Sequence, residues 1–525
     1  MNLRQRNILK LATLLVCLEL MIGARVVLSQ SIAQEPSDDI VTTKHQVTVD
    51  GRALKYTAQA GHLPIFDNQT GEVHANMFFI SYTLDSANTV ASRPLTFLWN
   101  GGPGSSSSLV HLLGFGPRRL QPDGIAVDNP GTWLEQTDLV FIDPIGTGYS
   151  RPTKVNYGPE FYQNTGDAES VSEFIRVYRN RFESWDAPIF LAGESFGVTR
   201  AAGVADVLQR RSIPVNGVIL MGLTLPLGQL NNEQRAALAL PSFTAAAFAN
   251  KKLEPSLQSD LQATLQQAET FALSTYLPAL TRRDSLTSAE KQTILSQLAR
   301  FSGLNPKDID TKTLTIPMEA FAKQLLAERN QVVGRYDSRL VGPLTNEQIY
   351  DPTKDPSLKN IINDIGVLRY FRNELEYKSD LKYQGPFGGG YPPPTAFRGD
   401  WMSVKWGRPA PPTQRPTGAS SAPPGAPAAT SPPDQPLRRA MIANPKLRVL
   451  VTCGYYDLVC SYSANTYLAN HLETEIPHNV TARGYGGGHA LYTDQSAQLE
   501  FKHDVMKFMQ DAASTGTKAT QRNKD

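Results

Sequence analysis

Residues 188–197 read Pro-Ile-Phe-Leu-Ala-Gly-Glu-Ser-Phe-Gly, and the fold is inferred outward from this stretch. Its apolar first half, Pro188 to Ala192, predicts a strand, and Thr199 to Arg210 predicts a helix. Between them lies Gly193-Glu194-Ser195-Phe196-Gly197, a G-x-S-x-G pattern in a strand–turn–helix setting. The flanking glycines allow a strained turn that lifts the Ser195 hydroxyl clear of the backbone. This context favours a nucleophile over an ordinary serine turn.

Short apolar runs followed by glycine-containing turns recur along the chain. They are Leu95 to Trp99, Asp138 to Ile142, Gly217 to Met221 and, much later, Arg448 to Thr452. Strands that are apolar on both faces, separated by helical stretches such as Asp167 to Glu183, are typical of a mainly parallel sheet with helices on both faces. The sequence therefore predicts an α/β protein.

Composition divides the chain around this sheet. Residues 34–230 and 437–512 hold the two parts of the α/β core, and the first part begins with β-hairpins. Residues 231–384 are rich in Leu, Ala, Gln, Glu and Lys, with apolar residues at helical spacing, which predicts a helical cap inserted over the functional edge of the sheet. The proline-rich residues 385–436 predict a flexible loop, and residues 513–525 a disordered tail.

The first 33 residues predict a secretory signal peptide. A basic start is followed by the apolar run Leu11 to Leu20, and Ser31-Ile32-Ala33 offers the small residues that a signal peptidase reads. The apolar run is too short to cross a bilayer, and Glu19 interrupts it. We therefore expect export to the periplasm or the extracellular space, with cleavage near Ala33 and no stable membrane anchor afterwards.

Charge and cysteine content exclude several classes of function. The chain has 51 Lys and Arg residues against 49 Asp and Glu residues, so neither sign argues for nucleic acid or a membrane surface as the main partner. Three cysteines exclude a disulfide scaffold and a zinc site of four cysteines. No other cluster has the spacing of metal ligands. We expect neither a metal nor an organic cofactor.

A nucleophilic serine needs a base, and the base needs a carboxylate that orients it. His489 ends the loop Gly486-Gly487-Gly488-His489, whose three glycines have no side chains and so let the histidine ring reach the turn at Ser195. Asp457 follows the strand Arg448 to Thr452 after a short turn, and the order Ser, Asp, His is the one that this kind of fold uses. Other late histidines fit less well, because two lie on predicted helices and one in a polar turn: His471, His503 and His478.

Stabilisation of an oxyanion needs fixed backbone N–H donors near the attacked carbonyl. The N–H of Phe196, directly after the serine, is one candidate. The glycine-rich turn Asn100-Gly101-Gly102-Pro103-Gly104 follows a predicted strand and supplies the N–H of Gly102 as the second.

With these motifs in hand, the sequence resembles the serine carboxypeptidases of the α/β-hydrolase fold, the group of cathepsin A and the yeast vacuolar carboxypeptidase. The matching blocks, in the order of the family, are Leu98 to Ser106, Asp143 to Ser150, Gly193 to Gly197, Gly454 to Asp457 and Gly487 to His489.

The resemblance implies a catalytic triad and an oxyanion hole. In it, Ser195 is the nucleophile, His489 the general base and acid, and Asp457 its orienting carboxylate, while Gly102 and Phe196 supply the oxyanion hole. It also implies that Asn100 and Glu194 bind the terminal carboxylate of the substrate.

Two departures from the family pattern stand out. Ser105 replaces a cysteine that closes a long-range disulfide, so that bridge cannot form. Gly114 stands where the family has a second glutamate that reads the terminal carboxylate, which puts strict exopeptidase specificity in doubt. Export permits a disulfide between Cys453 and Cys460, and the sequence leaves this pairing open.

The leading hypothesis is an exported serine-type carboxypeptidase that acts on peptide or protein C-termini through an acyl-enzyme. The alternative is an esterase or acyltransferase on the same scaffold, because a fold does not fix its substrate. A binding protein that merely retains the fold is the third hypothesis, and the complete triad argues against it.

Overall fold

The computed structural model describes residues 39–85, 93–222, 227–345, 354–359, 361–385, 436–472, 476 and 479–521. The expected signal peptide and nearly all of the expected proline-rich loop therefore lie outside the described residues. From Ile40 on, the elements belong to one compact unit. No helix among the described residues is both long and apolar enough to cross a membrane.

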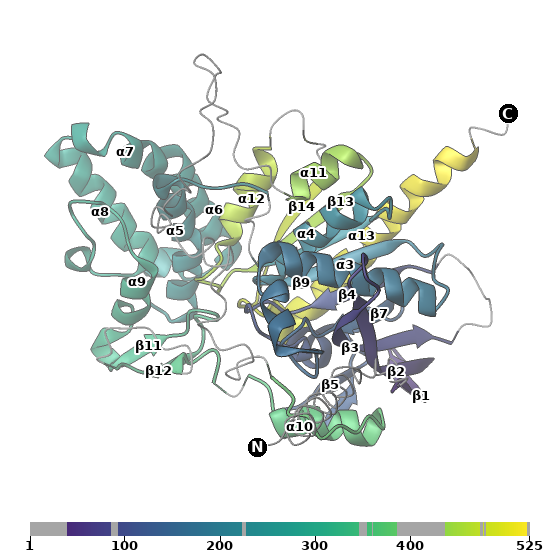
Figure 1. Ribbon diagram of the computed structural model, residues 1–525. Helices are drawn as coiled ribbons and strands as arrows, with labels where there is room; N and C mark the ends of the chain where they lie inside the picture. The colour runs from purple at the N-terminus through teal and green to yellow at the C-terminus, as the bar shows by residue number, and fades with distance from the viewer. Residues whose placement is uncertain are drawn as a thin grey trace, which may run out of the picture. The chain divides into compact units, whose positions relative to one another are not determined.

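The central sheet of the described chain has ten strands in the order β1-β2-β3-β7-β4-β9-β10-β13-β14, with β8 paired to β3 off this path (Figure 1). The strands are β1 (Val41–Val49), β2 (Arg52–Phe66), β3 (Val73–Leu84), β4 (Leu95–Trp99), β7 (Asp138–Ile142), β8 (Arg151–Pro152), β9 (Ile189–Glu194), β10 (Gly217–Met221), β13 (Arg448–Gly454) and β14 (Val480–Tyr485). β1 to β3 form antiparallel hairpins, and the run from β7 to β14 is parallel. The predicted hairpins and mainly parallel sheet are confirmed.

Alternate residues of the parallel strands enter two separate apolar cores. In β10, Val218 and Leu220 face the core beneath α3 (Asn164–Arg181), α4 (Gly197–Arg210) and α11 (Pro436–Ala443). Ile219 and Met221 face the opposite core, which α13 (Gln495–Gln521) and the π-helix η1 (Val110–Phe115) cover. Each of these strands is buried on both faces, and this explains why they are continuously apolar in the sequence.

The cap forms a third apolar core of its own. It consists of α5 (Asn232–Ala249), α6 (Leu261–Phe271), α7 (Leu277–Thr281), α8 (Ser288–Ser302), α9 (Met318–Gln324) and a hairpin of β11 (Gln331–Val333) and β12 (Val341–Pro343) (Figure 1). Capping boxes begin two of its helices, at Asn231 and Thr287, where side chain and backbone satisfy one another's hydrogen bonds.

Two segments differ from their prediction, one in the core that it packs on and one in its secondary structure. Residues 361–384 were expected in the cap, but α10 (Asp364–Arg369) and the π-helix η9 (Tyr370–Glu374) pack on the core of the sheet through Val367, Tyr370 and Phe371. Residues 513–525 were expected to be a disordered tail, whereas α13 continues to Gln521. For the first segment, the helical spacing correctly predicted helices, but helical spacing alone does not show which apolar core a helix packs on.

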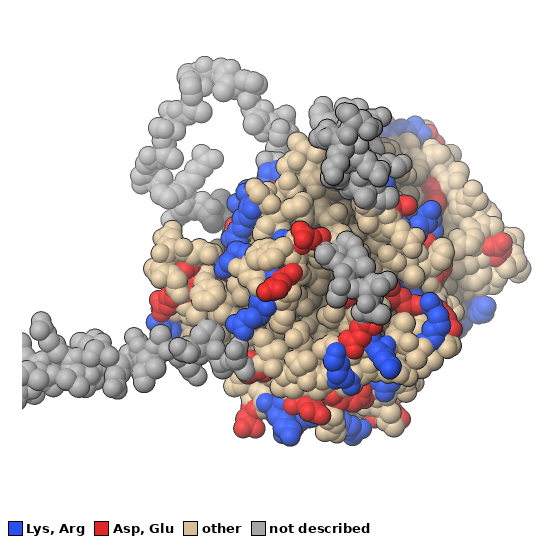
Figure 2. Space-filling model, turned by 90° about the vertical axis from the view of Figure 1, so that its right-hand side faces the viewer, with Lys and Arg blue, Asp and Glu red and all other residues tan. Residues whose placement is uncertain are grey.

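The remaining described elements are short: β5 (Arg118–Leu120), β6 (Ala126–Asp128), α2 (Gly158–Phe161), α12 (Tyr462–Asn470) and the 3₁₀ turns and π turns between them, among them η11 (Leu491–Thr493). On the face shown in Figure 2, Lys and Arg side chains lie interspersed with Asp and Glu, and neither sign gathers into a continuous patch. This distribution agrees with the near-zero net charge of the sequence.

Candidate active site

The turn between β9 and α4 places Ser195 at the carboxyl end of the central strand. Ser195 has a φ of 56°, in the left-handed region that side chains other than glycine rarely adopt. Its N–H donates to the carbonyl of Met221 in the neighbouring strand β10, at 2.8 Å, which holds the turn in this strained form. The strained serine turn predicted from the glycines is therefore present.

His489 and Asp457 form a buried hydrogen-bonded pair. Nδ1 of His489 lies 2.6 Å from Oδ2 of Asp457, so the carboxylate fixes Nδ1 as the donor and leaves Nε2 as the acceptor nitrogen of the neutral ring. The other oxygen of Asp457 accepts the N–H groups of Val459 and Cys460, at 2.7 and 3.0 Å. Burial lowers the pKa of His489, but the carboxylates of Asp457 and Glu194 outweigh it, so that the net pKa lies above the usual range.

The pair and the serine turn meet at the end of β10. A Cβ at Gly222 would lie 3.4 Å from Cε1 of His489 and 3.5 Å from N of Ser195, so ring and turn flank the same point. Nε2 of His489 is buried and has no hydrogen-bond partner within the described part of the chain. The structure thus brings Ser195, Asp457 and His489 together. In the described part of the chain, Nε2 of His489 does not yet form a hydrogen bond with Ser195, as is common without substrate.

The glycine-rich turn after β4 lies against the backbone of the serine turn. A Cβ at Gly101 would lie 2.4 Å from N of Phe196 and 2.6 Å from O of Glu194, so only glycine permits this approach. In addition, the indole N–H of Trp99 donates to the carbonyl of Gly197 at 2.9 Å. These contacts bring the two predicted oxyanion donors, the N–H groups of Gly102 and Phe196, into one region.

Asn100 and Glu194 are joined directly. Nδ2 of Asn100 donates to Oε2 of Glu194 at 2.8 Å, while Oδ1 of Asn100 accepts the N–H of Val110 at 3.0 Å and so fixes the orientation of the amide. Burial raises the pKa of Glu194, an effect that His489 and Asn100 partly offset. Because Oε1 of Glu194 lies 3.7 Å from Nε2 of His489, this polar pair lies next to the outward-facing side of the Asp457–His489 pair.

Tyr492 is a residue of this site that sequence reasoning missed. Its ring is fully buried, and its hydroxyl lies 3.5 Å from Nδ2 of Asn100. A Cβ at Gly114 would lie 3.4 Å from the ring of Tyr492, so the missing side chain at position 114 leaves room for this ring. Its place three residues after His489 is the only sign of it in the sequence.

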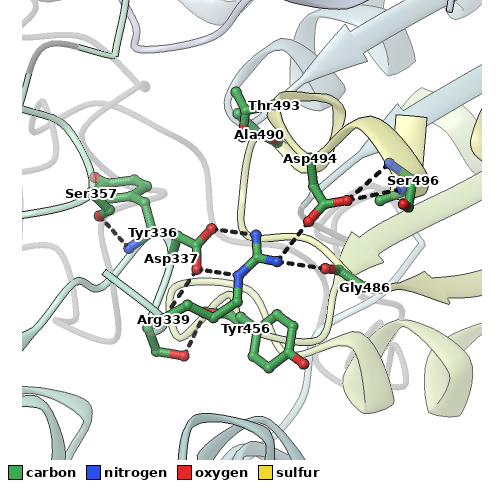
Figure 3. A network of polar contacts seen from close by, with 12 residues as sticks. Tyr336, Asp337, Arg339, Ser357, Tyr456, Gly486, Ala490, Thr493, Asp494 and Ser496 are labelled. Atoms are coloured by element: carbon green, nitrogen blue, oxygen red, sulfur yellow. Dashed lines mark hydrogen bonds and ion pairs between the residues drawn. The ribbon is translucent and has the colours of Figure 1, made fainter. Parts of the chain in front are cut away.

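The cap also contacts the site. The carbonyl of Tyr336 accepts the N–H of His489 at 2.6 Å, and the two rings meet edge to face with centroids 5.2 Å apart. Nearby, Arg339 contacts Asp337, Asp494, Gly486 and Tyr456 (Figure 3). No motif in the sequence pointed to this segment.

Cys453 and Cys460 are free thiols, so the disulfide that the sequence left open is not formed. With Asp457 they are the group of described side chains close enough together to hold a metal ion. Metal binding conflicts with the contacts of Asp457, because its carboxylate already accepts hydrogen bonds from His489 and from two backbone N–H groups. Burial raises the pKa of Cys453 well above its usual range, which opposes the thiolate that a metal would need.

The structure does not bring the other late histidines into the site. His471 ends α12, stacks on Tyr467 and bonds to its carbonyl at 2.7 Å. His503 lies on α13 with an exposed side chain. His478 lies outside the described residues.

Comparison with known proteins decides the family. Residues 50–380 match the family model "Serine carboxypeptidase". The chain belongs to the serine carboxypeptidase family. The resemblance seen in the sequence motifs is thereby confirmed.

Curated relatives match shorter stretches. The chain is 30% identical over 203 residues to the pheromone-processing carboxypeptidase KEX1 of Yarrowia lipolytica, which is 38% of this chain and 31% of that protein. It is 35% identical over 201 residues to the protein of the same name from Lachancea thermotolerans, 37% of this chain and 26% of that protein. The matched stretches thus span less than a third of the length of these relatives.

Among solved structures, the chain is similar to KEX1(delta)p, a prohormone-processing carboxypeptidase from Saccharomyces cerevisiae. The TM-score is 0.52 at 17% identity, and the match covers 87% of this chain and 91% of the other. At this identity the likeness concerns the fold alone. The prediction of an α/β-hydrolase fold, with a mostly parallel central sheet and helices on both faces, is confirmed.

Proposed function

We propose that this member of the serine carboxypeptidase family is itself an exported carboxypeptidase, which hydrolyses the C-terminal peptide bond of peptides or proteins. The observation that carries the proposal is the placement of the Asn100–Glu194 pair 3.7 Å from the unpartnered Nε2 of His489. A terminal carboxylate bound by this pair would hold the last peptide bond of a substrate at the serine turn.

In the proposed reaction, Nε2 of His489 takes the proton of Ser195 as Oγ attacks the carbonyl carbon of the last peptide bond. The N–H groups of Gly102 and Phe196 stabilise the oxyanion of the tetrahedral intermediate. His489 then gives the proton to the leaving nitrogen, the C–N bond breaks, and the C-terminal amino acid departs. Water, deprotonated by His489, attacks the acyl-enzyme, releases the shortened peptide and restores Ser195.

In binding, the proposed roles of Asn100, Glu194 and Tyr492 are complementary. The amide of Asn100 donates a hydrogen bond, and Glu194 donates one when it is protonated. The hydroxyl of Tyr492 has a pKa far above its usual range, because of burial and of Glu194, and is therefore a neutral donor. A phenol next to the amide supplies polarity to the site without a second negative charge.

The alternative is an esterase or acyltransferase, which would form the same acyl-enzyme and differ in the leaving group or the acceptor. Incubation of the mature protein with a blocked N-acyl dipeptide, its C-terminal amide and a simple ester tests both, with Ser195→Ala as the control. Release of the free amino acid from the dipeptide supports the carboxypeptidase. Ester cleavage without dipeptide cleavage would replace it by the alternative.

A further inference from the structure

The hairpin of β11 and β12 reaches from the cap to both loops that hold the proposed base and its acid. At its tip, Ser338 donates its N–H to the carbonyl of Tyr456 at 2.9 Å, and the carbonyl of Arg335 accepts the N–H of Leu458 at 2.9 Å. These two contacts hold the residues on either side of Asp457. The contact of the Tyr336 carbonyl with the N–H of His489 holds the second loop.

Arg339, at the end of this tip, joins the same loops through its side chain (Figure 3). Nε and Nη2 bind the two oxygens of Asp337 at 2.9 and 2.7 Å, a bidentate contact that fixes the plane of the guanidinium. Nη1 donates to the carbonyl of Gly486 at 3.0 Å and to Oδ2 of Asp494 at 2.8 Å. The guanidinium also lies over the ring of Tyr456, 4.7 Å from its centroid.

The residues that Arg339 contacts therefore lie close to Asp457 and His489 along the chain. Tyr456 directly precedes Asp457, and Gly486 begins the glycine loop that ends at His489. Asp494 begins the turn into α13 and accepts the N–H groups of Ser496 and Ala497, both at 3.1 Å.

The packing leaves little room for these parts to shift. A Cβ at Gly488 would lie 2.5 Å from the carbonyl oxygen of Tyr336 and 2.6 Å from Cβ of Asp337. The loop of His489 is thus pressed directly against the hairpin tip, and a displacement of the hairpin must displace the loop.

We propose that Arg339 is a positioning residue for the Asp457–His489 pair, and that through it the seating of the cap controls whether His489 faces Ser195. The inference rests on the catalytic roles proposed above. Arg339 touches no reacting atom. It acts by fixing the loop of Asp457, the loop of His489 and the start of α13 against one another.

The magnitude follows from the geometry of catalysis. A displacement of about 1 Å in a reacting group lowers the rate by roughly a hundredfold. Loss of the guanidinium also leaves the carboxylates of Asp337 and Asp494 without their shared counter-charge. We therefore expect Arg339→Met to lower kcat by about tenfold or more while KM changes by less than about twofold, since the Asn100–Glu194 pair is not touched.

The test compares Arg339→Met, Arg339→Lys and Arg300→Met as purified full chains. Arg300 is a matched control in the cap, because it binds Glu254 at 2.7 Å and lies over the ring of Phe301 at 5.1 Å, far along the chain from the triad loops. Three quantities are measured well below the melting temperature: kcat, KM for a blocked dipeptide, and the second-order rate of labelling by a fluorophosphonate, which needs the Ser195–His489 alignment but no peptide binding.

In the expected result, Arg339→Met loses kcat and labelling rate in parallel, Arg339→Lys regains part of both, and Arg300→Met stays within about twofold of the wild type. A folded Arg339→Met with wild-type kcat and labelling rate would overturn the positioning role. If that variant does not fold, the comparison of Arg339→Lys with wild type decides in the same way. A wild type that is labelled but releases no amino acid overturns the carboxypeptidase instead, and the labelling rates still decide the role of Arg339.

Discussion

Nε2 of His489 lies 3.7 Å from Oε1 of Glu194, so the nitrogen that we propose as the acceptor of the serine proton has a carboxylate beside it. Both side chains are buried. The negative charge stabilises the imidazolium form and is one cause of the raised pKa of His489. In the proposed mechanism, this contact lets Glu194 affect both the pKa of the base and the binding of the substrate terminus.

For the base, we expect Glu194→Gln to move the acid limb of kcat/KM to lower pH when the substrate is an ester or a peptide amide. The neutral amide removes a charge that favours the imidazolium, so the pKa of His489 falls and the neutral base persists at lower pH. The pH profiles of wild type and variant with the same ester are the measurement. An acid limb that stays in place or moves to higher pH contradicts the interpretation.

For substrate binding, we expect KM for a blocked dipeptide to rise with pH in the wild type, while KM for its amide does not. Glu194 has a raised pKa and keeps its proton to a higher pH than an ordinary carboxyl group, and only the protonated form can donate to an anionic terminus. In Glu194→Gln the rise should vanish. Parallel KM profiles for acid and amide in the wild type would refute the role in carboxylate binding.

We expect Tyr492→Phe to raise KM for the blocked dipeptide by about threefold to tenfold, which is the range for one lost hydrogen bond, and to leave ester cleavage within about twofold. Tyr485→Phe is the control, because its hydroxyl is engaged with Asp504 at 2.8 Å. Steady-state kinetics on both substrates is the measurement. An equal loss of kcat/KM for the dipeptide and for the ester would indicate a general packing defect.

Ser195→Ala should lower turnover by at least about a thousandfold without unfolding the protein, because no other group can form the acyl-enzyme. Activity and fluorophosphonate labelling are measured beside the melting temperature of wild type and variant. Labelling that persists in the variant would place the nucleophile elsewhere.

Since Cys453 and Cys460 are free, unfolding the mature protein without reductant in the presence of an alkylating reagent should add one group to each of them. Mass spectrometry of the tryptic peptides reads this directly. Peptides that carry the two cysteines joined and unalkylated would show that the pair is oxidised in the purified protein.

Much of the fold and most of the candidate site follow from the sequence for a simple reason. Runs such as Leu95–Trp99 and Gly217–Met221 are buried on both faces, which gives each strand a strong signature of its own. The residues expected at the serine turn and in the two loops come together because parallel strands all end at one edge of the sheet.

What the sequence did not predict are contacts between segments that carry no local pattern. Tyr492 packs against position 114 and lies beside Asn100, which is a relation between three positions that no local pattern reveals. Arg339 lies in a short hairpin tip whose composition resembles any polar loop. For the same reason residues 361–384 were assigned to the cap, since helical spacing does not say which core a helix joins.

The division of the α/β core by the cap has a consequence for biosynthesis. A ribosome completes the strand of Ser195 and the turn that exposes it long before β13 and β14 exist. Until those last strands join the sheet and the cap hairpin holds their loops, a growing chain has Ser195 without the histidine that we propose as its base. Under the proposed mechanism, the order of the segments along the chain therefore keeps the nascent chain inactive until the final docking step.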